Sequence, residues 1–506
     1  MVFDSSVSYG GVSLNSVLLQ GPDRNNDLRA VLMRFRNGTI GVSADIEHMF
    51  HSFHLPKPHR DYVRFFWFKN NHPSEPIVQW RAKVHVFGNK PSPSCAIYGL
   101  RCAMDFEVVD DCPSESKDLI KSNCYMDDAM AAYDEEFDAI SALEGARRKL
   151  AMFKIRLHKV SSNNEVVIQS FPESELNKAY SEEGEILCGA LGLVWSVDAD
   201  SFKFDIQVPD KEFTPRGVLS VNHSVWDPLG LLSPLLIQGR ILQRKMFEAR
   251  QGKHKGVAVD WDAPLGMEHY QEWCVFKSSL TVLGTLSFPR AYYSDRVVPV
   301  VRQELHCFGD ASLSALGFCI YLRTFGSEDV ECSLVFAGSR VIPRSATSMP
   351  RLELCANLEV SKASLRVSEA LGIPMDRSYF YTDSMVSLGY QNNSDKTFSR
   401  YVTRRKELIN NMTSNASWRY VSSSENPADL ASRPQNVEAL CSDLWLHGPP
   451  MLRDYNYNAN ETSLIDFCSD EELPEEKIEV NCLAVKSVHE PTLFSPSAGT
   501  CGSLGK

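Results

Sequence analysis

The spacing of apolar and polar positions changes along the chain, and these changes divide the sequence into parts of different character. Between residue 1 and about residue 165, short apolar runs at 39–44 and 84–87 indicate strands. Residues 27–36 and 136–153 have the apolar spacing of amphipathic helices. Strands and helices mixed in this way predict an α+β domain over residues 1–165.

The remainder of the chain has a less regular part and then a regular one. Residues 166–300 are interrupted by DPLG at 227–230 and WDAP at 261–264, which predicts connecting subdomains. From Leu305 to about Arg433 the pattern is strand, strand, strand, helix, strand, helix, which predicts a compact α/β domain over 301–436. The last part, residues 437–506, turns polar and acidic beyond Pro450 and then Ser/Gly-rich, which predicts a disordered tail or truncated linker there. The predicted fold class is therefore multidomain, α+β followed by α/β.

Composition excludes several classes of protein. No run of about 18 apolar residues occurs, so we expect no transmembrane segment and no membrane partner. The start of the sequence lacks the basic and apolar regions of a signal peptide, which favours a cytoplasmic rather than a secreted protein. The 14 cysteines are scattered without a C-x-x-C spacing, so we expect free thiols rather than disulfides or zinc knuckles.

Net charge neither supports nor excludes a nucleic-acid partner. The chain carries −12, whereas phosphate binding is largely electrostatic and favours basic proteins. Residues 461–480 hold eight acidic groups and one lysine, so this stretch alone contributes −7. The rest of the chain is therefore only mildly acidic.

A pair of adjacent acids lies in the run CYMDDAMAA at 124–132. Apolar flanks on both sides predict a hairpin with Asp127 and Asp128 at its tip, where both carboxylates can reach one cation. Asp45, 82 residues before Asp127, ends another apolar run and supplies a third acid. Three such acids suit two divalent ions about 4 Å apart that catalyse phosphoryl transfer. The alternative is a solvated acidic turn without catalytic function.

Several motifs together resemble reverse transcriptases. The tetrad YMDD at 125–128 follows an A-D-x-x-x-x-F segment at 44–50 and a G-x-x-x-S-P segment at 88–93. The runs GVSLNSVLLQGP, LMRFR and RDYVRF, which begin at residues 11, 32 and 60, are similar to retrotransposons of the BEL/Pao family.

This resemblance implies roles for individual residues. Asp45 and Asp127 would bind two Mg²⁺ or Mn²⁺ ions, with Asp128 beside them. Phe50 would be the steric gate that excludes a ribose 2′ hydroxyl, although it could also be an ordinary core residue. Four more residues would contact the nucleotide or the primer: Phe87, where many relatives have glutamine, Gly88, Lys159, which could equally be a solvated surface lysine, and Gly192 in the primer-gripping run ALGLVW.

Four acids recur at the ends of elements in the C-terminal α/β part. Asp310 follows an apolar strand, Glu353 lies in the first turn of a helix, Asp383 ends the strand YFYTD, and Asp429 lies in NPADLASR at 426–433. Acids at helix starts often only complement the helix dipole. Four acids on strand, helix, strand and helix resemble the ribonuclease H fold, and NPADLASR resembles its BEL/Pao version. The resemblance implies a second site with two metal ions that hydrolyses RNA in an RNA–DNA hybrid. The absence of a histidine at 421–425 leaves the product-release step of this family without its usual residue.

The resemblance covers about residues 2–450 and implies a domain order. Partial fingers and palm would occupy 1–165, primer grip, thumb and connection 166–300, and the ribonuclease H-like domain 301–436. The run VFDSS at 2–6 resembles the interior of a longer motif, so we expect truncated fingers. Expected partners are an RNA template, a DNA or tRNA primer, the hybrid and deoxynucleoside triphosphates, in the cytoplasm or in a virus-like particle, with no capsid or integrase part in this chain.

Three other functions are weighed against this one. An aspartic peptidase, a label that this region of Pao polyproteins sometimes carries, needs Asp-Thr-Gly or Asp-Ser-Gly, and neither tripeptide occurs. An integrase would need a zinc-binding His/Cys segment that is not evident. A catalytically impaired remnant of the element that binds only nucleic acid or protein stays open, because the missing fingers favour it and the intact acids oppose it.

Overall fold

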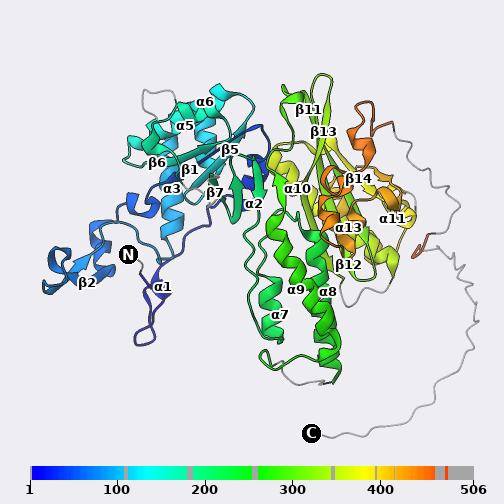
Figure 1. Cartoon of the computed structure of the whole chain (residues 1–506), viewed down its shortest axis with the longest axis horizontal. Coiled ribbons are helices and arrows are strands. Elements are labelled where there is room, and N and C mark those ends of the chain that lie inside the picture. The colour runs from blue at the N-terminus through cyan, green and yellow to red at the C-terminus, as the bar shows by residue number, and fades with distance from the viewer. Residues whose placement is uncertain are drawn as a thin grey trace, which may run out of the picture.

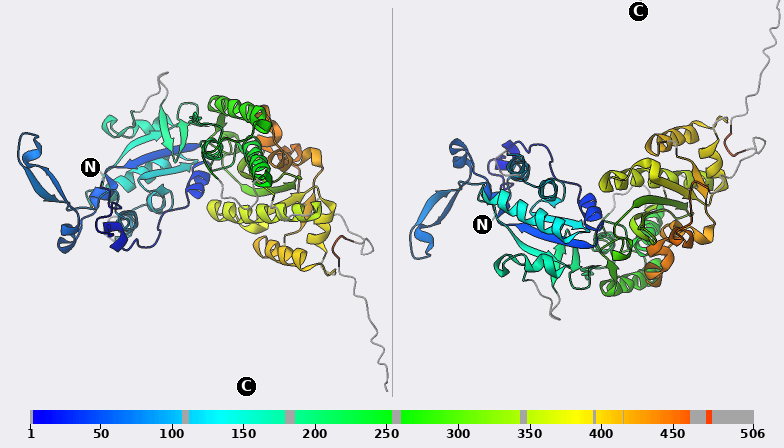
Figure 2. Two further views of the ribbon diagram at one scale, coloured as in Figure 1. Left: turned by 90° about the horizontal axis from the view of Figure 1, so that it is seen from below. Right: turned by 90° about the horizontal axis from the view of Figure 1, so that it is seen from above.

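The structure of the protein is a computed structural model, which describes residues 3–106, 112–178, 186–253, 260–342, 348–393, 396–414, 416–461 and 473–476. An N-terminal lobe and a C-terminal lobe lie side by side in Figures 1 and 2, and a group of helices extends from the junction in Figure 1. The disordered tail predicted beyond Pro450 falls mostly outside the described residues. The prediction is wrong for residues 451–461, which pack on the C-terminal lobe, where buried Arg323 donates to the carbonyls of Leu452 and Tyr457.

The N-terminal lobe is built on a four-stranded sheet of order β4-β5-β1-β6. Helices pack on it through a core that includes Leu100, Leu119 and Leu143. The sheet consists of β1 (Ile40–Ile46), β4 (Cys124–Tyr125), β5 (Asp128–Tyr133) and β6 (Leu157–Ser162), and the helices are α1 (Leu14–Val17), α2 (Leu28–Phe35), α3 (Ser92–Asp105), α4 (Ser114–Lys121), α5 (Glu136–Ala151) and α6 (Glu165–Gln169).

Local chemistry explains where two of these helices begin. The Asp27 side chain accepts hydrogen bonds from the backbone N–H groups of Arg29 and Ala30, which caps α2. α5 has acids in its first turn and bases in its last turn, which complements the helix dipole. The helices predicted at 27–36 and 136–153 and the strand predicted at 39–44 are thus confirmed.

The strand predicted at 84–87 is wrong. Only an isolated bridge joins Val84 to His54, and the chain then enters a turn. The Val86 carbonyl accepts a hydrogen bond from the Ser92 hydroxyl at 2.8 Å, so a side chain satisfies it instead of a neighbouring strand. Val86 is buried, which explains its apolar character without a sheet.

A two-stranded hairpin, β2 (Arg64–Phe68) and β3 (Ile77–Arg81), projects from the far end of the N-terminal lobe. It exposes several large apolar side chains, including Phe66, Trp67 and Trp80. Its strands pair in antiparallel register with each other and with no other strand of the described residues.

A second sheet and three helices follow in the middle of the chain. The sheet has the order β10-β9-β8-β7, and none of the described helices is long and apolar enough to cross a membrane. The strands are β7 (Leu187–Ala190), β8 (Leu193–Ser196), β9 (Ser201–Lys203) and β10 (Ser287–Pro289), and the helices are α7 (Pro215–Asn222), α8 (Ser233–Lys253) and α9 (Tyr270–Val282).

The C-terminal lobe contains a five-stranded sheet of order β13-β12-β11-β14-β15, in which β11 pairs antiparallel with β12 and parallel with β14. Between Leu305 and Arg433 the sequence predicted this order of elements except for two more helices and the last strand. The strands are β11 (Arg302–Ala311), β12 (Ala315–Phe325), β13 (Val330–Val341), β14 (Ser378–Thr382) and β15 (Trp418–Tyr420), and the helices are α10 (Met349–Leu371), α11 (Met385–Asn392), α12 (Arg400–Met412), α13 (Ala428–Ser432) and α14 (Asp443–His447).

Two buried arginines join these parts. Arg290, with no exposed side-chain surface, forms an ion pair with Asp200 and donates to the backbone carbonyls of Phe35, Gly38 and Thr39. Arg36 donates at 2.9 Å to the carbonyl of Leu334 on β13 and at 2.9 Å to that of Arg290. One hydrophobic core also runs without interruption from α2 through the second sheet into the C-terminal lobe. The lobes are therefore held as one packed unit.

We predict that Arg290→Ala destabilises the protein strongly, because it leaves Asp200 and three carbonyls without their buried donor. The free energy of unfolding should fall by about 3–5 kcal/mol. Urea unfolding followed by tryptophan fluorescence measures this change. Arg296→Ala is the control, since the side chain of Arg296 is 71% exposed and its removal should cost little. Equal effects of the two substitutions would contradict the role given to Arg290.

Candidate active sites

The first group of acids lies at one end of the N-terminal sheet. Asp127 and Asp128 lie at the turn between β4 and β5, and Met126 has a left-handed φ of 54° at its tip. Asp45 on β1 pairs in register with Asp128, and the Ile46 N–H donates to the Asp127 carbonyl at 2.8 Å. The hairpin predicted from the sequence is confirmed, and the sheet brings Asp45 beside it.

Two basic side chains of β6 contact the carboxylate of Asp45. His158 Nε2 lies 2.9 Å from Oδ1, and Lys159 Nζ donates to Oδ2 at 3.1 Å. The register pairs Asp45 with His158, after a bulge in β1 between Ser43 and Asp45. Lys159 was expected from the sequence, whereas His158 was missed, because the partner across a sheet depends on a register that spacing does not reveal.

Burial and mutual repulsion perturb the two acids of the hairpin. Burial, then the neighbouring charges of Asp127 and Asp45, raise the pKa of Asp128 to about 6. Burial is also the largest cause of the raised pKa of Asp127. Lys159 opposes both shifts. Raised pKa values at grouped carboxylates are typical of sites that bind cations.

The remaining predicted residues surround this end of the sheet to different extents. Phe50 is half-buried and packs edge-on against the exposed Phe87, with ring centroids 4.8 Å apart. Gly88 has φ +98°, and an added Cβ would lie 1.9 Å from the Phe3 carbonyl, so only glycine fits.

Gly192 turns the chain between β7 and β8. Its φ is +94°, and an added Cβ would lie 2.6 Å from the indole nitrogen of Trp226. Trp226 donates to the Leu191 carbonyl at 3.1 Å, so this hairpin has an aromatic support that the sequence did not reveal. The Cys188 thiol of β7 lies 3.4 Å from the Ser43 hydroxyl of β1, which places the hairpin strand near Asp45.

The second group of acids is in the C-terminal lobe. β11 and β14 run parallel, and Phe308 pairs with Tyr381. Asp310 lies two residues after Phe308 and Asp383 two residues after Tyr381, so the two acids lie at the same end of the sheet. Glu353 was predicted in the first turn of a helix, but α10 begins at Met349 and its first turn holds no acid, so Glu353 lies just beyond that turn. Carboxylate atoms of Asp310, Glu353 and Asp383 all lie within 4.8 Å of one another, a spacing that no other trio of potential ligands reaches in the described part of the chain.

Crowding of buried carboxylates shapes this cluster. Burial, followed by the charges of Asp310 and Asp383, raises the pKa of Glu353 to about 9. Burial likewise raises the pKa of Asp310 to about 7, against the opposing hydrogen bond from Ser432. Among the described residues, Glu353 Oε2 is buried with no hydrogen-bond partner. An orphaned oxygen beside two more carboxylates fits a divalent cation, which binds such oxygen ligands.

Hydroxyl and amide groups hold the other acids in place. The Ser423 hydroxyl donates to Asp383 at 2.5 Å, and Asn426 lies 3.5 Å from the same carboxylate. Asp429 on α13 stands outside the closest trio and pairs with Arg433, although its charge still raises the pKa of Asp310. Of the four predicted acids, the structure therefore gathers three tightly and places the fourth at the edge.

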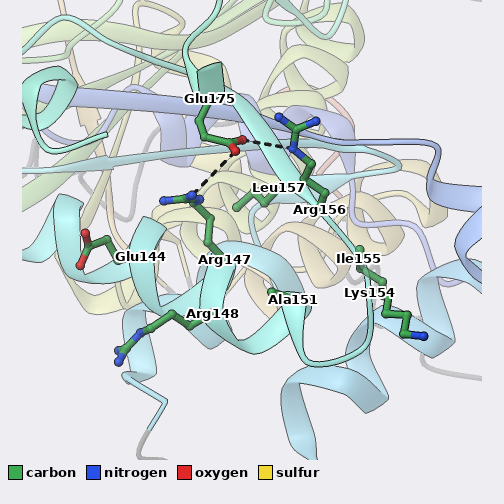
Figure 3. A pocket seen from close by; sticks show the side chains of 9 residues that line it. All are labelled: Glu144, Arg147, Arg148, Ala151, Lys154, Ile155, Arg156, Leu157 and Glu175. Atoms are coloured by element: carbon green, nitrogen blue, oxygen red, sulfur yellow. Dashed lines mark hydrogen bonds and ion pairs between the residues drawn. The ribbon is translucent and has the colours of Figure 1, made fainter. Parts of the chain in front are cut away.

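A basic hollow lies on the N-terminal lobe, lined mainly by α5 and the chain that leads into β6 (Figure 3). Its volume is about 500 Å³, and Glu175 in its wall lies 3.3 Å from Arg156 and 4.0 Å from Arg147. Arg156 also pairs with Glu47 at 3.2 Å. These ion pairs compensate only part of the positive charge, because the lining holds four basic residues and two acidic ones.

Comparison with known proteins places part of the chain in a family. Residues 214–384, about a third of the chain, match the Pao retrotransposon-like RNaseH-like domain. That segment includes Asp310, Glu353 and Asp383. The resemblance to Pao elements is thus confirmed for this segment, and no curated protein matches the sequence.

Solved structures extend the likeness to the N-terminal lobe. The foamy viral protease-reverse transcriptase dRH in complex with double-stranded DNA matches with a TM-score of 0.52 and 14% identity. The match covers 83% of this chain and 62% of that one. The foamy viral protease-reverse transcriptase in complex with an RNA/DNA hybrid gives a TM-score of 0.48 at 14% identity, over 81% of this chain and 48% of that one. The chain therefore has a mixed α/β multidomain fold that resembles a retroviral reverse transcriptase and includes an RNaseH-like domain.

We predict that Glu353→Gln stabilises the metal-free protein at alkaline pH. Glutamate ionises near pH 4.5 in the unfolded chain but near 9 in the fold, so its contribution to stability is complete below about pH 4.5 and is lost as the pH rises towards 9. Glutamine does not ionise, so the variant should gain about 2 kcal/mol at pH 8 and almost nothing at pH 4.

Denaturant unfolding in a chelating buffer at both pH values measures this difference. Glu369→Gln, an exposed position on the same helix, is the matched control and should change stability at neither pH. A Glu353→Gln variant that is no more stable than wild type at pH 8 would show that Glu353 ionises normally.

Proposed function

We propose that this chain carries the RNA-directed DNA polymerase and ribonuclease H of a BEL/Pao retrotransposon. The observation that carries the proposal is the cluster of Asp310, Glu353 and Asp383, with its buried oxygen that lacks a partner. It lies in the segment that matches the Pao RNaseH-like domain. These three carboxylates, with Asp429 at their edge, suit hydrolysis of an RNA strand paired with DNA.

At this cluster the residues would position reacting atoms rather than form covalent bonds. Two Mg²⁺ or Mn²⁺ ions, when bound, would activate the attacking water and stabilise charge on the scissile phosphate. Asp310, Glu353 and Asp383 would hold these ions. Asp429 would become the fourth acidic ligand once its ion pair with Arg433 is broken. Ser423 and Asn426 orient Asp383, and Ser432 orients Asp310, so the carboxylates are already directed inward.

The N-terminal acids support a polymerase site with the same chemistry. Asp45, Asp127 and Asp128 would hold two ions that activate a primer 3′ hydroxyl and stabilise the leaving pyrophosphate. Phe50, propped by Phe87, would select deoxynucleotides through its ring. Gly88 and Lys159 would lie along the incoming triphosphate, and Gly192 would lie in the hairpin that grips the primer.

Substrates and domain roles follow from this proposal. Fingers and palm would occupy 1–165, primer grip and thumb 166–300, and the nuclease 301–436. The substrates would be an RNA template with a DNA or tRNA primer, deoxynucleoside triphosphates, and the RNA–DNA hybrid that synthesis creates. Because both sites belong to one packed unit, a single duplex could serve both.

One observation favours a second candidate function for the N-terminal lobe. His158 and Lys159 both occupy the Asp45 carboxylate, the place that a metal ion would need. If these contacts persist on nucleic acid, the lobe would bind template and primer without extending it. The protein would then be a nuclease with a binding module.

We predict that Asp310→Asn abolishes cleavage of RNA in a hybrid. Loss of one metal-binding carboxylate should lower the cleavage rate by at least about a hundredfold, because charge stabilisation by the metal is worth several kcal/mol. The assay follows a labelled RNA strand on DNA in Mg²⁺. Asp376→Asn, an exposed position in the same domain, is the matched control. Hybrid cleavage that persists in Asp310→Asn at the rate of the control would exclude this cluster as the nuclease site.

We also predict that the double substitution Asp127→Asn, Asp128→Asn stops primer extension but leaves hybrid cleavage intact. The two acids belong to one site only, so the activities should separate. Extension of a labelled DNA primer on RNA measures the first activity, and Asp138→Asn on α5 is the exposed control. Equal extension by wild type and the double variant would leave the binding module as the better description of this lobe.

A further inference from the structure

Four residues of the acidic C-terminal segment lie against the ribonuclease H-like lobe. Residues 473–476, the short red stretch in Figure 1, lie beside α11. Glu476 forms a bridge with Phe398, and the Ser399 N–H donates to the Glu475 carbonyl at 2.9 Å. The segment thus docks on the surface of the lobe as a tight turn, in which the Glu476 N–H donates to the Leu473 carbonyl at 3.1 Å.

Charge holds the middle of this segment. Arg351 binds the Glu475 carboxylate through two nitrogens, at 2.6 and 3.0 Å, and the Ser399 hydroxyl donates to the same carboxylate at 2.5 Å. Lys396 donates to Glu476 at 3.0 Å. The Arg351 and Lys396 contacts lower the pKa of Glu475 and of Glu476 respectively, so both stay charged.

An apolar anchor fixes the start of the segment. The Leu473 side chain packs onto Gly389 of α11, where an added Cβ would lie 2.8 Å from its Cδ2. The Tyr390 hydroxyl donates to the Pro474 carbonyl at 2.8 Å. A two-part contact of this kind, apolar and ionic, indicates a defined docking position.

The docking position and the acid cluster involve the same two helices. Arg351 lies in the first turn of α10, two residues before Glu353 and on a different face of the helix, and α11 begins two residues after Asp383. Helix α12 beside them begins with Arg400 and also carries Arg404, Arg405 and Lys406. The segment therefore lies on a basic surface, and helix α10, which contributes Arg351 to that surface, also carries Glu353.

We propose that Arg351, Lys396 and Ser399 form a phosphate-binding surface for a strand of the hybrid, and that residues 473–476 are its competitor within the chain. Arginine binds a carboxylate and a phosphate with the same two-nitrogen geometry, so Glu475 stands where a strand phosphate would bind. The hybrid must displace the segment before it reaches Asp310, Glu353 and Asp383. This inference rests on the proposed nuclease function and adds a restraint on it.

Binding of a hybrid to the full chain tests the competition without requiring cleavage. The probe is a fluorescent RNA–DNA hybrid of about 20 base pairs, and its binding is measured by anisotropy in EDTA. The double substitution Glu475→Gln, Glu476→Gln should tighten binding by about threefold to tenfold. Gly389→Ala, whose added methyl group would clash with Leu473 without changing the charge, should also tighten binding.

A charge-matched control separates docking from net charge. Glu328→Gln, Asp329→Asn removes two exposed adjacent acids from the β12–β13 turn of the same lobe and should leave binding unchanged. Equal affinity of wild type, the Glu475/Glu476 variant and Gly389→Ala would overturn the competition. The same holds if the control tightens binding as much as the Glu475/Glu476 variant, or if no variant binds the hybrid.

Cleavage measured in parallel distinguishes the two proposals. Tighter binding by the Glu475/Glu476 variant together with no Mg²⁺-dependent cleavage would remove the nuclease function and leave the docking surface. In the opposite case, Asp310→Asn abolishes cleavage, but the Glu475/Glu476 variant and Gly389→Ala bind the hybrid with unchanged affinity. That result would support the nuclease function and exclude competition by residues 473–476.

Discussion

The buried guanidinium groups of Arg36 and Arg290 hold the architecture together. Each binds backbone carbonyls from segments that are far apart in the sequence, and Arg36 connects the end of α2 to both β10 and β13. A buried charge of this kind is tolerated only when its hydrogen bonds are met, so the pieces around it must meet in one arrangement. The constraint fixes the N-terminal sheet relative to the ribonuclease H-like sheet, and with them the two groups of acids.

Both groups of acids oppose folding in the absence of a cation. Burial and like charge raise the pKa values of Asp128, Asp310 and Glu353, which means that their ionised forms are unfavourable in the fold. The two groups differ in how the rest of the chain compensates the charge of the acids. Asp45 is satisfied by His158 and Lys159, whereas an oxygen of Glu353 has no hydrogen-bond partner among the described residues. Local strain of this kind is typical of sites that a ligand completes.

Local features were predictable from the sequence, and contacts across elements were not. The turn at Asp127 and the helix that carries Glu353 follow from apolar spacing and from turn chemistry, which neighbouring residues determine. The pairing of His158 with Asp45 depends on a strand register across 113 residues and on a bulge. The burial of Arg36 and Arg290 contradicts the usual exposure of arginine, and the apolar run 84–87 packs as a loop. Such features depend on tertiary contacts.

Manganese soaked into a crystal tests the central claim most directly, because its anomalous scattering locates the ion without any assay. The account predicts Mn²⁺ coordinated by carboxylate oxygens of Asp310, Glu353 and Asp383 at about 2.2 Å, with Glu353 Oε2 among the ligands. Glu353→Gln should lose that peak. A cluster that stays free of manganese at millimolar concentration, while the ion binds elsewhere on the protein, would contradict it.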